Sequence, residues 1–109
     1  MRLQAIYAHL SCSDFEASIA WFAKLFGSEP DARPMDGLAE WHHEAHAGFQ
    51  LYRNPPDAGR ATMTLIVADL EAEHTRLDKA GVEVGEIMSG EYVRYLQVAD
   101  PDGNRVVLA

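Results

Sequence analysis

The chain has 109 residues, of which 48% are hydrophobic and 24% are charged, as in an ordinary globular protein. This length fits a single domain with a modest core, because a chain of this size buries only about two-thirds of its surface. Nine basic and seventeen acidic residues give a net charge of −8, which argues against a nucleic acid or an anionic membrane as partner.

Cys12 is the only cysteine, so no disulfide can form within the chain. The sequence has no basic-then-apolar leader and no apolar run near the roughly 18 residues of a membrane span. These features predict a cytoplasmic protein. Cys12 lies in an apolar stretch without an activating base nearby in sequence, which favours a packed thiol over a nucleophile.

The first half of the chain opens with a strand and a helix. Residues 3–12 alternate loosely between apolar and polar side chains, as a strand does. Ser13 or Asp14 can cap the following helix, because their side-chain oxygens accept hydrogen bonds from free backbone N–H groups. The helix has an apolar stripe of Phe15, Ile19, Phe22 and Phe26. Gly27 is a plausible stop.

Three further strands are predicted before mid-chain. Residues 29–37 contain two prolines and allow only a short or edge strand. Residues 38–44 and 48–53 fit two longer strands. The stretch 54–59, Asn-Pro-Pro-Asp-Ala-Gly, reads as a linker and falls where a boundary between two halves would lie.

The second half repeats this order of elements. A strand is predicted at 61–68 and a helix at 70–80. The remaining strands are predicted near 82–88, 92–99 and 104–108. A tight turn at 100–104 joins the last two, because its proline presets φ and its glycine supplies a positive φ.

The two helix starts are similar in sequence and lie half a chain apart. Ser13-Asp14-Phe15-Glu16-Ala17 corresponds to Ala68-Asp69-Leu70-Glu71-Ala72, and each helix runs to a glycine. Such self-similarity indicates a duplicated unit. We therefore predict one α+β domain over 1–109 made of two tandem βαβββ modules, 1–55 and 60–109, that form a cleft or half-barrels.

These motifs together resemble the vicinal oxygen chelate superfamily. The resemblance rests on the element order, on Trp21-Phe22 followed by Leu25-Phe26-Gly27, and on the Asp-Pro-Asp-Gly-Asn turn at 100–104. The superfamily includes glyoxalase I, extradiol dioxygenases, and the fosfomycin and bleomycin resistance proteins. Covering nearly the whole chain, the resemblance implies a glyoxalase/bleomycin resistance-like fold and a homodimer, with a cleft built within one chain or across two.

In metal-dependent members, the first and last strands of each module supply the ligands, typically His and Glu. The resemblance places Tyr7, Gln50, Thr62 and Val107 at these positions. A divalent ion needs roughly three or more nitrogen or oxygen donors, and Val107 offers none. We therefore expect no metal and no other cofactor. His9 lies two residues beyond Tyr7 on the same strand face, so one imidazole could still reach the cleft.

The densest group of potential ligands is Trp-His-His-Glu-Ala-His, starting at Trp41. It lacks the His-Glu-x-x-His spacing of zinc proteases. On a strand, His42, Glu44 and His46 would share one face, and Trp41 and His43 the other. A solvated strand and turn is the simplest interpretation. The alternatives place Trp41 and His43 in the cleft, or give His42 and His46 an adventitious metal.

His9 is the candidate catalytic residue. A lone histidine in an apolar strand is often a hydrogen-bonded core residue. Beside Tyr7 on the cleft side, it could instead act as a general base or bind a ligand. The residues alone leave both interpretations open.

The sequence is compatible with three functions. The first is a metal-independent small-molecule binding protein resembling the bleomycin resistance branch, which binds a cationic or aromatic ligand without turnover. Its cleft would be lined by Tyr7, His9, Trp41, Gln50, Tyr52 and Thr62. The second is a lyase, isomerase or dioxygenase of the glyoxalase type with an unconventional metal or histidine-based site. The third is an interaction domain with a vestigial cleft.

Overall fold

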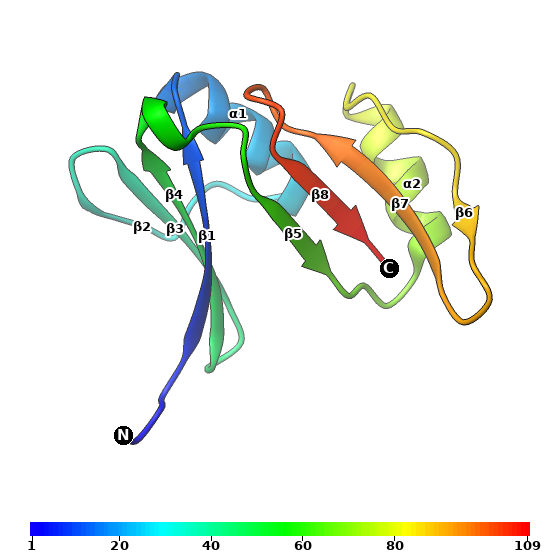
Figure 1. Cartoon of the computed structure of the whole chain (residues 1–109), viewed down its shortest axis with the longest axis horizontal. Coiled ribbons are helices and arrows are strands. Elements are labelled where there is room, and N and C mark those ends of the chain that lie inside the picture. The colour runs from blue at the N-terminus through cyan, green and yellow to red at the C-terminus, as the bar shows by residue number, and fades with distance from the viewer.

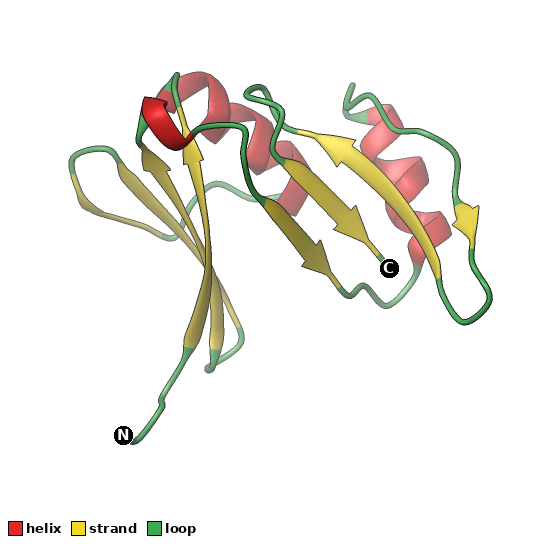
Figure 2. Cartoon of the chain, in the orientation of Figure 1, coloured by secondary structure: helices red, strands yellow, loops and turns green.

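The computed structural model describes residues 1–109 as two modules, each a four-stranded mixed sheet with one helix against it (Figures 1 and 2). The first module contains β1 (Ile6–Cys12), α1 (Phe15–Phe26), β2 (Ala32–Met35), β3 (Leu38–His43) and β4 (Ala47–Arg53). The second contains β5 (Thr62–Leu65), α2 (Leu70–Lys79), β6 (Met88–Ser89), β7 (Arg94–Ala99) and β8 (Arg105–Leu108). A short 3₁₀ turn, η1 (Pro55–Asp57), joins them. The predicted α+β fold of tandem βαβββ modules is confirmed.

The two sheets have the same topology. Their strand orders are β1-β4-β3-β2 and β5-β8-β7-β6, with the first pair parallel and the others antiparallel in each sheet. β1 and β5 therefore lie at the edges of their sheets, and each leaves one side of its backbone without a strand partner.

The two helices begin in the same way. Asp14 accepts a hydrogen bond from Ala17 N at 3.1 Å, and Asp69 accepts one from Ala72 N at 3.0 Å. Each carboxylate satisfies an N–H group that the first helical turn leaves free. At the end of α1, Gly27 has φ of 75°, a left-handed conformation that glycine adopts without steric cost.

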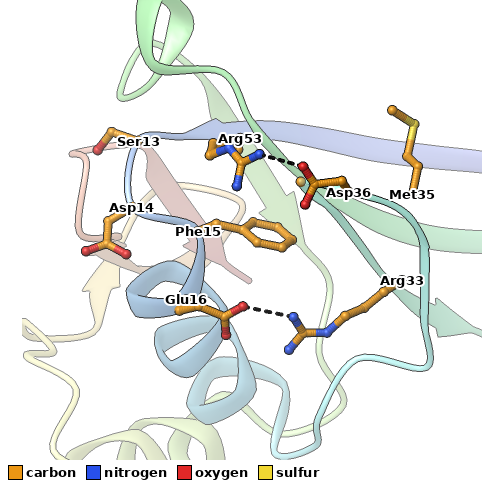
Figure 3. A pocket seen from close by; sticks show the side chains of 9 residues that line it. Ser13, Asp14, Phe15, Glu16, Arg33, Met35, Asp36 and Arg53 are labelled. Carbon is orange, nitrogen blue, oxygen red and sulfur yellow. Dashed lines mark hydrogen bonds and ion pairs between the residues drawn. The ribbon is translucent and has the colours of Figure 1, made fainter.

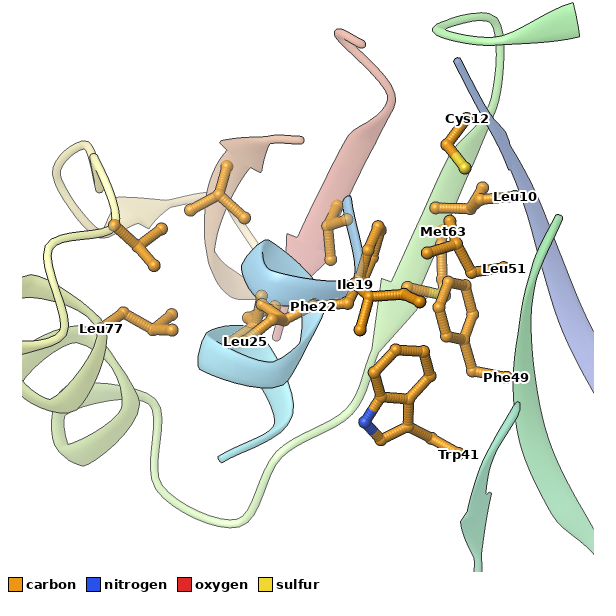
Figure 4. Close-up of a cluster of buried hydrophobic side chains, with 14 of the residues drawn as sticks. Leu10, Cys12, Ile19, Phe22, Leu25, Trp41, Phe49, Leu51, Met63 and Leu77 are labelled. Atoms are coloured by element: carbon orange, nitrogen blue, oxygen red, sulfur yellow. The ribbon is translucent and has the colours of Figure 1, made fainter. Parts of the chain in front are cut away.

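A single hydrophobic core joins the modules, with α1 lying between the two sheets (Figure 4). Phe22 of α1 packs against Phe49 of β4, with ring centroids 4.8 Å apart, and against Trp41 of β3 at 6.3 Å. Leu77 of α2 and Val106 of β8 are fully buried in the same cluster. Because one face of each sheet is used in this way, the opposite face of each remains open.

Polar contacts also hold the modules together. Asn104 donates from Nδ2 to Ser11 O at 2.9 Å and accepts from Ala61 N at 3.1 Å. Asp102 accepts hydrogen bonds from both the backbone N and the hydroxyl of Ser13. Arg76 of α2 donates to the last carbonyls of α1, which caps that helix from the other module.

Two predicted strands are shorter than expected. The strand predicted at 61–68 ends at Leu65, and the one near 82–88 is reduced to β6. Between α2 and β6 only Val82 is fully packed into the core, and its N–H bonds to Leu77 O at the end of the helix. The segment is therefore placed by the helix end and not by a neighbouring strand. Neither helix is long and apolar enough to cross a membrane.

Candidate functional site

The open face of the first sheet carries most of the polar residues predicted for the site. Successive strand residues point to opposite faces, so Leu10 lies in the core while Tyr7 and His9 point away from it. Strand register places His9 opposite Gln50, and Gln50 opposite Glu40. These three side chains form a row across β1, β4 and β3.

Hydrogen bonds connect this row and extend it to His42. His9 Nδ1 lies 3.1 Å from Gln50 Oε1, and Gln50 Nε2 donates to Glu40 Oε2 at 2.8 Å. His42 Nε2 lies 3.1 Å from Glu40 Oε1. Because carboxylate and amide oxygens only accept, both histidines bond as N–H donors. We call His9, Gln50, Glu40 and His42 the polar row.

Tyrosines lie on both sides of the polar row. The Tyr7 ring meets the His42 ring nearly edge-on at 6.0 Å, and the Tyr52 ring lies 6.0 Å from the His9 ring. In register, Tyr7 is opposite Gly48, and a Cβ at Gly48 would come within 2.8 Å of the Tyr7 ring. The ring therefore lies over the missing side chain. Aromatic walls with a few fixed polar groups are typical of small-molecule sites.

Glu40 carries the negative charge of this surface. The hydrogen bond from Gln50, followed by that from His42, holds the pKa of the Glu40 carboxyl below its usual range. Its side chain is 15% exposed, and its only ion-pair partner is His42. Glu40 was not among the residues predicted for the site. The sequence carries a signal for it, because Glu40 and His42 are two residues apart on one strand and therefore point to the same face.

The structure brings four of the six predicted lining residues together. Tyr7, His9, Gln50 and Tyr52 share the open face of the first sheet. Thr62 is exposed on β5, in the second sheet.

Trp41 does not lie on the open face. It is 1% exposed, packs under α1, and donates its Nε1–H to Ser28 O at 2.9 Å. The reason is register, because Trp41 pairs with Phe49 and both side chains point toward the helix. The prediction that Trp41 lines the cleft is therefore wrong (Figure 4).

The predicted common face of His42, Glu44 and His46 is also wrong. β3 ends at His43, and Glu44 has a φ of 59° in the turn that follows, so strand alternation stops there. His46 Nδ1 lies 3.0 Å from Gln4 O, near the start of the chain. His43 lies on the helix side, its ring 4.8 Å from that of Phe26. The cluster is thus divided among three environments.

The residues that the resemblance places at the ligand positions of metal-dependent relatives do not fit a divalent ion. Both ends of the Gln50 amide are used within the polar row. Thr62 and Val107 lie on the other sheet, and Val107 has no donor atom. No three His, Cys, Asp or Glu side chains come close enough together to hold a metal ion. We therefore derive no chemistry through a metal.

The second sheet has no counterpart of the polar row. By register, the row equivalent to His9, Gln50 and Glu40 consists of Thr64, Val107 and Gln97. None of these three side chains ionises. The duplicated modules thus differ in chemistry, and charge recognition is concentrated on the first.

Cys12 offers no nucleophile. Its side chain is fully buried, and burial raises the pKa of the thiol to about 11. The neighbouring Ser18 side chain lowers this pKa but is the smaller effect. Cys12 is a protonated packing residue at neutral pH, as its apolar strand context predicted.

A separate hollow of about 810 Å³ lies at the start of α1 (Figure 3). Its two arginines are each paired with a carboxylate, Arg33 with Glu16 at 3.0 Å and Arg53 with Asp36 at 3.1 Å. Both guanidinium groups lie about 6 Å from the centroid of the Phe15 ring. The positive charges of both arginines are thus compensated within the chain.

A smaller groove of about 480 Å³ opens between the modules, on the helix side of β1. Its lining is mostly apolar and includes Ala8, Phe49, Met63 and Leu65. It contains no part of the polar row.

The chain is similar to a known family and to several solved structures. A family model described as a glyoxalase-like domain matches residues 7–109. A glyoxalase/bleomycin resistance protein from Catenulispora acidiphila DSM 44928 is 32% identical, with 96% of each chain covered and a TM-score of 0.89. No curated protein is detectably similar in sequence.

Two more distant structures share the fold. TnmS3, an antibiotic binding protein from Streptomyces sp. CB03234, is 23% identical over 99% of this chain and 93% of its own, with a TM-score of 0.77. A lactoylglutathione lyase from Agrobacterium tumefaciens is 16% identical over 94% and 90%, with a TM-score of 0.76. One is named as a binding protein and the other as an enzyme, so the fold alone does not decide the activity.

Proposed function

Since the chain belongs to the glyoxalase-like domain family of the vicinal oxygen chelate superfamily, we propose that it is a metal-independent small-molecule binding protein of the glyoxalase/bleomycin resistance type. The binding surface is the open face of the first sheet, with Tyr7, His9, Gln50 and Tyr52 as contact residues. The observation that carries this proposal is the polar row, in which the amide of Gln50 bonds to both neighbours, at a position where the resemblance would place a carboxylate ligand.

The polar row suits binding better than acid–base catalysis. A glutamine amide is neither a useful acid nor a useful base near neutral pH, so Gln50 separates His9 from Glu40 as proton-transfer partners. The row also holds each donor and acceptor in a fixed direction. Fixed polar groups between aromatic side chains orient a ligand and give specificity without turnover.

The ligand we propose is cationic or aromatic. The chain carries a net charge of −8, which favours a basic or neutral molecule over an anion. Tyr7 and Tyr52 offer ring surfaces for stacking. TnmS3, which shares the fold, is described as an antibiotic binding protein, and this supports a small-molecule ligand.

An enzyme of the glyoxalase type, whether lyase, isomerase or dioxygenase, is the second candidate. One observation favours it: His9 is exposed on the open face, and its Nε2 makes no hydrogen bond within the chain. His9 would then act as the general base on a bound substrate. The shared fold of the lactoylglutathione lyase supports this alternative only by analogy.

We further propose that the complete cleft forms in a homodimer. Thr62 lies on the second sheet, and no hydrogen bond of the polar row reaches that sheet. The edge strand β1 begins with the exposed Ile6, and the exposed Ile66 follows the edge strand β5. A second copy would cover them. Both the dimer and the cytoplasmic location stay predictions.

A thermal-shift screen of cationic and neutral aromatic compounds tests the proposed function. A ligand at about 100 times its Kd stabilises a protein by about 2.7 kcal/mol, which is a Tm shift of roughly 10 °C in a domain of this size. We expect such shifts with metal chelator present, and their loss in Tyr52→Ala. The control is Tyr92→Ala, which removes an exposed tyrosine outside the open face.

The other functions give different results in this screen or in elemental analysis of the purified protein. Near-stoichiometric nickel, zinc, manganese or iron that is lost in His9→Ala would favour the enzyme. Shifts that survive in Tyr52→Ala would move the ligand away from the open face. No shift with any compound would leave the interaction domain with a vestigial cleft.

A further inference from the structure

Glu40 differs from every other carboxylate that forms an ion pair in this chain. The other four pair with arginine, and their side chains are at least 30% exposed. Glu40 is 15% exposed and pairs only with the imidazole of His42. The Glu40 carboxylate therefore has two hydrogen bonds from neighbouring side chains but no lysine or arginine cation beside it.

The carboxylate of Glu40 also has unused hydrogen-bonding capacity. Each oxygen accepts one hydrogen bond, from Gln50 on one side and His42 on the other. An ionised carboxylate can accept about four. Because the helix side of the sheet is filled by the core, the remaining capacity is directed to the open face.

Aromatic rings lie on both sides of Glu40 along the strands. Glu40 pairs with Gln50 across the sheet. The next row of paired residues on one side contains Tyr7 and Gly48, and the next row on the other side contains Tyr52. Rows on one face of a sheet are about 7 Å apart. A ring against either tyrosine can therefore place a charged substituent at Glu40.

From this arrangement we propose that Glu40 selects the charge of the ligand, and that the ligand is an aromatic or heteroaromatic molecule with a nitrogen cation. The cation lies against the free side of the Glu40 carboxylate, and the ring lies against Tyr7 or Tyr52. This inference rests on the proposed function, since it specifies the ligand of the same surface. It assigns selectivity to a residue outside the set predicted from sequence.

A comparison with the second module supports the assignment of charge selectivity to Glu40 alone. Gln97 occupies the position of Glu40 in the second sheet, opposite Val107. The second sheet therefore has a neutral amide, of nearly the same shape as a carboxylate, at the position where the first sheet has the charge of Glu40. Replacing Glu40 by glutamine gives the first face the same neutral side chain, so the Glu40→Gln variant isolates the charge from the shape.

The test uses two probes of similar shape, the 10-methylacridinium cation and uncharged acridine, titrated against the full chain in mildly alkaline buffer. High ionic strength screens the overall charge of the protein and leaves the short-range contact. We expect the cation to bind about tenfold more tightly than acridine or better, as for one close charge contact. In Glu40→Gln the two probes should bind almost equally, with acridine affinity unchanged.

Two further variants make the result specific. Glu16→Gln removes the same charge from an exposed ion pair with Arg33 outside the open face, and should keep the preference for the cation. His42→Ala removes one donor from Glu40 and should increase that preference, which provides a second test if Glu40→Gln is unstable. Melting temperatures of all variants establish that they are folded.

Each contrary result has a separate meaning. Equal binding of both probes by the native chain, lost in Tyr52→Ala, would overturn the role of Glu40 and leave the binding surface intact. Equal loss of both probes in a folded Glu40→Gln variant would make Glu40 a structural member of the site and also overturn the proposal. Absence of binding by either probe would overturn the cationic aromatic ligand, while the compound screen described above decides the proposed function independently.

Discussion

Gln50 donates a hydrogen bond to Glu40 at 2.8 Å from the directly opposite position of the neighbouring strand. The contact pairs the neutral amide of Gln50 with the carboxylate of Glu40. A glutamate at position 50 would place two carboxylates side by side. We expect Gln50→Glu to bring two carboxylates together beside His9, and hence to create three good donors for a divalent cation. Calorimetric titration with zinc or nickel should detect binding by this variant and none by the native chain.

Gln97→Glu is the matched control for this change. It introduces the same carboxylate at a glutamine of the second sheet, where the neighbour across the strand is Val107. Equal metal binding by both variants would mean that the added charge, and not the polar row, recruits the ion.

Gly48 determines the position of the Tyr7 ring. A Cβ at residue 48 would approach that ring to 2.8 Å and the Trp41 carbonyl to 3.0 Å. Gly48→Ala should therefore displace the ring and weaken binding of aromatic ligands, with a loss of about 1–3 kcal/mol in stability from overpacking. Gly85→Ala is the control, because an added Cβ there meets nothing. Unchanged binding in Gly48→Ala would remove Tyr7 from the binding surface.

The pH dependence of stability should report the Glu40 contacts. The pKa of Glu40 is lowered in the folded chain, so its contribution is fully present above the unfolded value near 4.5. It is lost as pH falls through the lower folded value. Urea denaturation in the acid range should therefore show a smaller loss of stability in Glu40→Gln than in the native chain. Parallel pH profiles would indicate that the hydrogen bonds to Glu40 contribute nothing to folding.

Asn104 should be the most sensitive polar residue at the junction between the modules. It is fully buried, and its amide bonds Ser11 O, Ala61 N and the carboxylate of Asp100. Asn104→Ala leaves these groups unpaired, and we expect a loss of about 3 kcal/mol or more in urea denaturation.

Asn54→Ala removes a single exposed hydrogen bond, from Asn54 to Asp57, and serves as the control. We expect it to change stability by about 0.5 kcal/mol or less. Similar losses in Asn54→Ala and Asn104→Ala would show that the junction does not depend on the buried amide.

Cys12 should react with thiol reagents only after unfolding. Burial raises the pKa of this thiol to about 11 and also blocks access to it. Labelling of the native chain, followed by mass spectrometry, should be slow and should accelerate in urea together with the loss of secondary structure. Rapid labelling under native conditions would indicate local opening at the end of β1.

Predictions based on neighbouring residues were confirmed most directly. The cap, predicted at Ser13 or Asp14 and found at Asp14, and the stop at Gly27 depend on the conformation of a single turn, so the amino acids there are sufficient. The duplicated order of elements could be recognised because the two helix starts have similar local sequences. The predicted strand ends at 61–68 and near 82–88 differ from the structure, because the end of β5 and the short β6 depend on which backbone groups find partners.

The composition of the open face required long-range information. Strand alternation alone leaves two possible faces for Trp41 and for Glu40, and a shift of one residue exchanges them. The choice is made by pairing with β4, which places Trp41 beside Phe49 under α1 and Glu40 beside Gln50.

The sequence by itself determined the duplicated order of elements and the helix boundaries, because these depend on local conformation and on the chemistry of individual side chains. Only the tertiary structure decided that Glu40 joins His9, Gln50 and His42 in one hydrogen-bonded row. The physical reason is that residues from three strands become neighbours only through strand pairing, and the burial of the opposite face fixes which side chains remain available to a ligand.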